Sequence, residues 1–285
     1  MGGKDLLERP LLSATVAAAN TIYPGQRIVR LGLPAEEPGW VRCVDVIGDA
    51  VFLRRWQADV GGALGTEHEM VPPITSATYV LSWYAAIPAF MGAVSFRLDR
   101  RVPRLAPEAL GFHRHQREHR PDGIALLDGR FWCLPDDPAA EDPVATVVAD
   151  EQVLAAVLRG QLRAHADAFL VGYDPGVRLP RRALLGVFFD ALDGAIWAAG
   201  KRIGCEGAGV RDAAIVLPGG TPEFGDGSAL YRLVDARGRE HVSRRRVACC
   251  YYYRLSGAEG ACFTCPRTTD EERVIRAAEW PDEHG

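Results

Sequence analysis

The hydrophobic residues of this chain form one long apolar stretch and two later stretches with helical spacing. Residues 71–96, VPPITSATYVLSWYAAIPAFMGAVSF, contain no charged side chain. A run of that length could cross a bilayer. Three prolines (Pro72, Pro73 and Pro88) and many small polar residues favour instead a helix buried in the protein, broken near Pro88.

Two amphipathic helices are predicted in the second half of the chain. Asp150 is typical of an N-cap, and the apolar residues after it recur at helical spacing: Val153, Leu154, Val157, Leu158, Leu162 and Phe169. Pro180 suits the first turn of a second helix, which we expect to end at Gly200. The apolar face of this helix consists of Leu184, Val187, Phe188, Leu192, Ile196 and Trp197.

The first half mixes short helices and strands. Residues 6–19 are predicted to be helical, and residues 40–60 fit either a strand pair or a helix. Residues 126–134 fit strand around a turn at Asp128 and Gly129. These elements place some β-structure before the two amphipathic helices.

The C-terminal part begins with a predicted hairpin. Residues 229–247 alternate in character and turn near Arg237 and Gly238. Near the end of the chain, Thr269 and Glu272 have the spacing of a capping box, so a short helix is expected there.

Together these elements predict an α+β protein with a mostly helical body and a small C-terminal lobe. The turn-rich segment PDDPAAEDP, residues 135–143, is typical of a boundary. We therefore divide the chain into an N-terminal helical and mixed region (1–145), a helical and hairpin core (146–247) and a C-terminal lobe (248–285).

Composition narrows the function classes. The chain has 285 residues and a net charge of −4, so no overall basic field indicates nucleic-acid binding. The opening residues, MGGKDLLERP, lack the apolar run of a secretory signal, so we expect a cytoplasmic protein. In the reducing cytoplasm, clustered cysteines more often bind metals or act in redox chemistry than form disulfides. Peripheral association with a membrane is left open.

Four of the seven cysteines lie within seventeen residues: Cys249, Cys250, Cys262 and Cys265. Thiolates select zinc, copper(I) or iron–sulfur clusters. Adjacent residues project in different directions, so the Cys249–Cys250 pair is unusual for a single zinc ion. The spacing alone leaves a zinc site and a 2Fe–2S cluster about equally favoured. Four unligated buried cysteines are the third alternative, which their close grouping disfavours.

The segment RRRVACCYYYRLSGAEGACFTCP resembles the C-terminal motif of the FhuF-type ferric-siderophore reductases. That motif consists of a CC pair, about ten residues and a CxxC pair that proline often follows. The resemblance implies that Cys249, Cys250, Cys262 and Cys265 bind one 2Fe–2S cluster, which makes residues 248–285 an iron–sulfur lobe. The spacer here has eleven residues. A weaker resemblance extends over residues 74–200.

The resemblance also implies an activity, namely one-electron reduction of a ferric siderophore followed by release of Fe(II). A ferredoxin-like protein would supply the electron, since the glycine-rich segments from Gly204 and from Leu217 lack the order of a nucleotide-binding loop. The alternatives are a zinc-stabilised binding protein and an iron–sulfur sensor without reductase turnover.

Four residues near the cysteines are candidates for substrate binding: Arg244, Arg245, Arg246 and Tyr252. In an alternating strand Arg244 and Arg246 share one face and Arg245 takes the other. Their positive charge would favour a reduced, more anionic cluster and attract an anionic partner. We expect the substrate pocket between the lobe and the helical body.

Two other sets of polar residues are assigned no chemistry. His113, His115 and His119 lie in an arginine-rich segment and fit a solvated charged face. Asp190 and Asp193 are one helical turn apart and fit the polar face of a helix.

Overall fold

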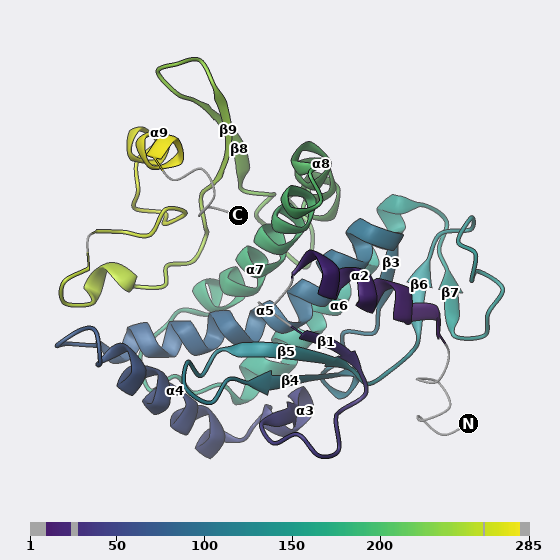
Figure 1. Cartoon of the computed structure of the whole chain (residues 1–285), viewed down its shortest axis with the longest axis horizontal. Helices are drawn as coiled ribbons and strands as arrows, with labels where there is room; N and C mark the ends of the chain where they lie inside the picture. Colours follow the sequence, from purple (N-terminus) through teal and green to yellow (C-terminus); the bar gives the residue numbers. More distant parts are fainter. Residues whose placement is uncertain (1–9, 24–27, 259, 280–285) are drawn as a thin grey trace.

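The computed structural model describes residues 10–23, 28–258 and 260–279. The predicted fold class is confirmed: the protein is α+β, with 48% helix and 15% strand, and the cysteine cluster lies in a small C-terminal lobe. Figure 1 shows the helices gathered around α5, Pro73–Asp99, with a sheet against them and the lobe at one end.

The long helix α5 is the centre of the body, and it packs along α7, Arg181–Arg202. Pro72 and Pro73 stand at its start, where proline costs no hydrogen bond. The expected break near Pro88 is wrong, because the helix runs through that residue. Proline removes one hydrogen bond inside a helix, and here packing on every side of a fully buried segment offsets that loss.

Both α5 and α7 are long and apolar enough to cross a membrane by length and composition alone. Their most apolar stretches are, respectively, 78% and 61% buried in the protein. Core helices pass the same test, and the burial of these two supports the predicted buried helix at residues 71–96.

The other helices surround this pair. Asp150 caps α6 as predicted, since its carboxylate accepts a hydrogen bond from the Val153 amide at 2.9 Å. The predicted helix at residues 6–19 is seen from residue 10 onward, and its first residues lie outside the described ranges. These helices are α2 (Ser13–Ile22), α3 (Cys43–Val46), α4 (Ala50–Leu64), α6 (Glu151–Gly172) and α8 (Glu206–Val216), with 3-10 turns η1 (Pro10–Leu12) and η2 (Pro107–Ala109).

Two small sheets cover the body. The first has the order β1-β5-β4-β2, formed by Ile28–Leu31, Pro121–Leu126, Leu110–Arg114 and Trp40–Arg42. The second has the order β3-β6-β7, formed by Arg101–Pro103, Phe131–Cys133 and Ala145–Val147. The strands on either side of the turn at residues 128–129 therefore belong to different sheets. The ambiguous residues 40–60 contain both a strand, β2, and helices.

One hydrophobic core extends from Leu12 to Ala248. At its centre, the Tyr84 hydroxyl and the His165 Nε2 atom are 2.9 Å apart, and both side chains are fully buried. Cys43 and Cys133 are buried in this body, as isolated structural cysteines would be, whereas Cys205 is exposed.

The three histidines at 113, 115 and 119 do not converge. His113 lies on β4 and its Nδ1 is 2.5 Å from an Asp122 carboxylate oxygen. His115 and His119 follow in a turn, where His119 has a left-handed backbone (φ 60°) and its carbonyl accepts from the Trp56 indole at 2.7 Å. His115 and His119 therefore do not lie on one face of a helix.

The predicted hairpin is formed by β8 (Leu230–Val234) and β9 (Glu240–Arg244) and leads into the cysteine loop, so from here on we call residues 228–279 together the lobe. Gly238 turns it with a φ of 76°. After the cysteine loop and the 3-10 helix η3 (Tyr252–Arg254) comes α9, Asp270–Glu279. The predicted capping box is confirmed: the Thr269 amide donates to Glu272 at 3.0 Å and the Glu272 amide donates to the Thr269 hydroxyl at 3.2 Å.

Candidate metal centre

Backbone turns bring the two halves of the cysteine motif together. Tyr251, directly after Cys250, has a left-handed backbone (φ 58°), which side-chain-bearing residues seldom adopt. This residue reverses the chain and leads into η3. Gly257 and Gly260 have φ values of 74° and 96°, which glycine adopts without a steric penalty. The loop can therefore return to the second half of the motif.

The four thiols approach one another as two pairs. The Cys250 and Cys262 sulfurs are 3.8 Å apart, and the Cys249 thiol lies against that of Cys265. All four are near each other, with Cys265 buried and the others half-buried. Within residues 10–23, 28–258 and 260–279, no three His, Cys, Asp or Glu side chains are placed to hold one ion. The donor set is thus two adjacent thiol pairs, whose sulfurs suit soft metals and iron–sulfur clusters.

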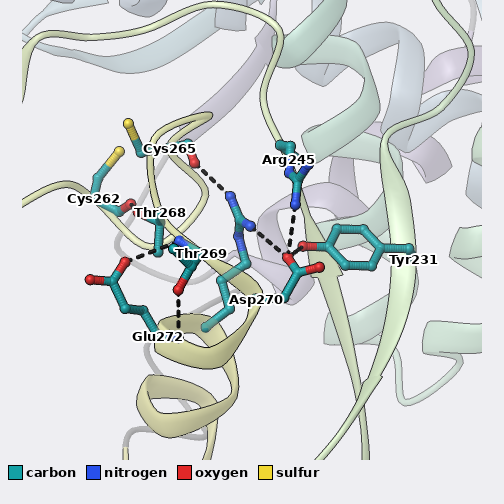
Figure 2. Close-up of polar contacts among 9 residues, drawn as sticks. Tyr231, Arg245, Cys262, Cys265, Thr268, Thr269, Asp270 and Glu272 are labelled. Carbon is teal, nitrogen blue, oxygen red and sulfur yellow. Dashed lines mark hydrogen bonds and ion pairs between the residues drawn. The ribbon is translucent and has the colours of Figure 1, made fainter.

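The last helix fixes the CxxC turn through buried polar contacts. Arg273 is fully buried, and it donates to the Cys265 carbonyl at 2.5 Å and to the Asp270 carboxylate at 2.9 Å. The Thr268 hydroxyl donates to the Cys262 carbonyl at 2.9 Å. Figure 2 shows the Cys262 and Cys265 sulfurs pointing in the same direction, away from α9.

Arg246 donates hydrogen bonds to both sulfurs of the Cys250–Cys262 pair. Its Nη2 atom donates to Cys250 Sγ at 3.1 Å and to Cys262 Sγ at 2.7 Å. The hydrogen bond from Cys262 and the positive charge and hydrogen bond of Arg246 lower the pKa of Cys250 to about 5, against the effect of burial. The same hydrogen bond and burial raise the pKa of Cys262. The pair therefore holds a thiolate at neutral pH, and thiolate is the form that ligates metals.

The other two arginines have different surroundings. Arg244 donates to the Asp190 carbonyl, and its guanidinium lies against Gly194 of α7, where any larger side chain would collide with it. Arg245 points the other way and forms a 3.0 Å ion pair with Asp270 (Figure 2). The predicted alternation therefore holds for these side chains, and Arg245 is not part of the cysteine site.

Asp190 and Asp193 of α7 anchor the lobe to the body. The Asp190 carboxylate accepts from the Val247 and Ala248 amides at 2.9 and 2.8 Å. Asp193 accepts from the Ser228 hydroxyl at 2.6 Å, at the other root of the lobe. Burial raises the pKa of Asp190 to about 6, although Arg244 and the two amides oppose that rise.

The expected polar helix face at these positions is wrong, because Asp190 is 6% exposed and Asp193 is fully buried. A signal for this role was present in the sequence. Asp190 falls three residues after Val187 and seven before Trp197, on the apolar face itself. A carboxylate in that position must find a buried partner.

A cavity of about 330 Å³ lies between the lobe and the body beside the Cys250–Cys262 pair. Its size is within the usual range for small-molecule sites. Tyr252 and Arg246, two of the predicted binding residues, contribute to its wall. The lining residues are Tyr79, Ser82, Trp83, Arg246, Cys250, Tyr252, Cys262 and Thr264.

A second cavity of about 500 Å³ is more apolar and lies further along α5 and α7. Tyr23, Phe90 and Trp197 give it aromatic walls, and Arg244 and Cys262 border it. A third space of about 180 Å³ lies between Asp190 and the Cys249–Cys250 pair. The expected pocket between lobe and body is therefore present as three neighbouring cavities, of which arginine lines each.

No protein-family model matches this chain, and a search of curated proteins finds no match either. The resemblance of the cysteine motif to the FhuF-type reductases thus remains a hypothesis that rests on the quoted residues.

Proposed function

We propose that the four C-terminal cysteines hold a 2Fe–2S cluster and that the protein is a ferric-siderophore reductase of the FhuF type. The observation that carries this proposal is the arrangement of the thiols. Two thiol pairs lie side by side at the wall of cavities, and a guanidinium donates to the sulfurs of one pair. A binuclear cluster takes two thiolates on each iron, so two pairs suit it better than they suit one tetrahedral zinc ion.

When bound, such a cluster supplies a one-electron relay. Arg246 would hold the Cys250 and Cys262 sulfurs in place and stabilise added negative charge, which raises the reduction potential. Tyr79, Trp83 and Tyr252 form the aromatic wall against which a ferric chelate would rest. Asp190 fixes the backbone directly before Cys249 and Cys250 by accepting hydrogen bonds from two amides.

The chemistry of release follows from the electron count. The chelated Fe(III) gains one electron and becomes Fe(II), the donor loses one electron, and no covalent bond of the siderophore needs to break. Hard oxygen ligands hold Fe(III) tightly and the softer Fe(II) less well, so reduction loosens the complex. A ferredoxin-like protein is the proposed donor.

The test begins with anaerobic purification, iron and sulfide analysis, and visible and EPR spectra before and after dithionite. We expect a coloured protein that bleaches on reduction and gives a one-electron 2Fe–2S signal, which Cys250→Ser abolishes. Turnover of a ferric siderophore would then be followed with an Fe(II) trap. A colourless protein with one zinc ion would overturn the reductase proposal and leave a zinc-stabilised binding protein.

A further inference from the structure

The charge of the protein is unevenly distributed along the chain. Residues 228–268, which form the hairpin and the cysteine loop, contain eight arginines and three acidic residues, a net charge of +5. The whole chain carries −4, so all the other residues together carry −9. The hairpin and cysteine loop are therefore a basic segment of an acidic protein, whereas residues 269–285, which follow them, carry a net charge of −4. A negatively charged partner would be attracted to the hairpin and cysteine loop.

Part of this charge is exposed next to the cysteines on an ordered surface, which we call the arginine–tyrosine surface: Tyr251, Tyr253, Arg254 and Arg267. The Arg254 guanidinium lies 5.6 Å from the Tyr251 ring centre, and that of Arg267 lies 4.7 Å from the Tyr253 ring centre. The two rings are 6.5 Å apart, and both arginines are exposed. Stacking restrains the two cations, so they lose less freedom when a partner binds.

This surface adjoins one thiol pair in particular. The Tyr251 amide donates to Cys249 Sγ at 3.4 Å, and Arg267 follows two residues after Cys265. The 330 Å³ cavity is bordered instead by Cys250 and Cys262, and the 500 Å³ cavity by Cys262. The smaller 180 Å³ space is lined by Cys249 as well as Cys250. The exposed arginines therefore lie beside the Cys249–Cys265 pair, whereas the two larger cavities lie beside the Cys250–Cys262 pair.

Two acidic residues of the first turn of α9 are engaged in other contacts. Asp270 pairs with Arg245 and Arg273, and it accepts from the Tyr231 hydroxyl at 2.6 Å. Glu272 closes the capping box of α9. Arg254 and Arg267 are exposed, and among the residues that the structure describes each guanidinium has a tyrosine ring as its partner.

We propose that the arginine–tyrosine surface docks an acidic one-electron carrier protein, which delivers its electron through the Cys249–Cys265 side while the ferric chelate occupies the Cys250–Cys262 side. This inference rests on the proposed function. The reduced carrier would lose one electron and the chelated Fe(III) would gain it, with the cluster that the four cysteines would hold supplying the relay, and no covalent bond of the siderophore would break. Two separate faces let donor and substrate be bound at the same time.

The test uses the whole protein and an acidic plant-type 2Fe–2S ferredoxin. The double variant Arg254→Gln/Arg267→Gln removes two positive charges from the surface. The matched control Arg232→Gln/Arg237→Gln removes two exposed arginines from the hairpin of the same lobe. Ferredoxin affinity is measured by calorimetry at low and high salt, and thermal unfolding verifies that each variant is folded. The single variant Arg267→Gln provides a smaller change at the same surface.

We expect the double variant to bind ferredoxin about tenfold more weakly at low salt, with the difference shrinking at high salt, and the control to change affinity less than twofold. Equal weakening by both double variants, or no weakening by the first, would overturn the docking proposal. A separate measurement reduces each protein with dithionite and follows a single turnover of a ferric siderophore.

That second measurement distinguishes the two proposals. Unchanged turnover in the double variant agrees with a surface that serves the donor alone. A loss of turnover with dithionite would assign the surface to the chelate and overturn donor docking. Absence of turnover in every protein, wild type included, would refute the proposed reductase, while the affinities would still decide whether an acidic protein binds there.

Discussion

The helical body and the C-terminal lobe of this protein are held together by different forces. The body buries large apolar side chains completely, among them Trp56, Phe169 and Phe188. The described part of the lobe from residue 228 buries three apolar side chains, Ala248, Leu255 and Cys265, and four polar ones, Asp235, Ser243, Thr268 and Arg273. Hydrophobic burial dominates the free energy of folding, so the body has a stability of its own that the lobe lacks.

The difference suggests a structural role for the proposed metal centre. Small units without a sufficient apolar core usually depend on disulfides or metals. The lobe has cysteines in free thiol form and a network of hydrogen bonds from arginines to carbonyls. We infer that ligation at the four thiols supplies the missing stability of the lobe, whereas the body depends on its own core.

Metal removal should have the largest effect on the difference in stability between the lobe and the body. After chelation under reducing conditions, we expect backbone amides of the lobe to lose at least about a hundredfold of their hydrogen-exchange protection, because ligation energy is folding energy in such units. Amides of α5 and α7 should keep theirs. The measurement is hydrogen exchange by mass spectrometry. Uniform loss in both regions would show that the body also depends on the metal.

Removing a core side chain tests the body in the opposite way. Phe188→Ala should lower the free energy of unfolding by about 4 kcal/mol, because it removes a fully buried ring and leaves a cavity. Urea unfolding followed by tryptophan fluorescence measures this loss. Val171→Ala is the control, since that side chain is 86% exposed and its change should stay within about 0.5 kcal/mol. The metal content of the lobe should be unaffected while the protein remains folded.

The body should also lose stability in acid through His165. Burial lowers its pKa to about 4, although a hydrogen bond to the Leu105 carbonyl at 2.5 Å opposes this. In the unfolded chain a histidine titrates near pH 6.5. Below that pH the unfolded state takes up a proton that the folded state refuses, so stability is present above about pH 6.5 and falls toward pH 4. The expected loss is about 3 kcal/mol.

The measurement is urea unfolding at pH 7 and pH 4.5 for the wild type and His165→Gln. Asp190 has the opposite slope, because its raised pKa keeps a proton on the folded state that the unfolded state releases. Comparing the two proteins cancels that contribution. If both lose stability by the same amount, His165 is not the group responsible.

Asp190 is one of the two carboxylates of α7 that anchor the lobe to the body. Asp190→Ala leaves the Val247 and Ala248 amides without their acceptor, which should cost about 2 kcal/mol. The loss should be confined to the lobe, seen as faster exchange of those two amides. The matched control is Asp226→Ala on the surface of the body, where the ion pair with Arg182 is long at 3.4 Å and exposed. Equal effects of the two substitutions would contradict the anchoring role of Asp190.

Sequence patterns predicted the body better than its connections. Helical spacing identified α6 and α7, and the capping residues Asp150 and Thr269 marked two helix starts, because these signals are local. The continuity of α5 through Pro88 was missed, since it depends on packing from several distant elements. The separate sheets on either side of residues 128–129 were missed for the same reason.

In the candidate site, too, local features could be predicted from the sequence and long-range contacts could not. The four cysteines and Arg246 could be proposed from spacing, because the motif is contained in one short segment. The position of Asp190 on an apolar face signalled a buried partner, but the identity of that partner and the cavity wall of Tyr79 and Trp83 could not be proposed. Those residues are more than fifty positions away and meet the lobe only in the folded chain. A single sequence contains no direct record of such pairs.

The smallest expected effect concerns the helix that fixes the CxxC turn. Thr269→Ala removes the hydroxyl that accepts from the Glu272 amide at 3.2 Å, and loss of such a cap typically costs about 1 kcal/mol. Helix α9 is short, and its Arg273 donates to the Cys265 carbonyl. Fraying at the start of α9 should therefore also loosen the Cys249–Cys265 pair. We expect faster metal loss to a chelator with no change in the urea midpoint of the body. Thr66→Ala, at the exposed end of α4, is the control, because its hydroxyl donates to the Ala63 carbonyl of the same helix. A slower or unchanged rate of metal loss in Thr269→Ala would mean that the cysteine loop keeps its shape independently of α9.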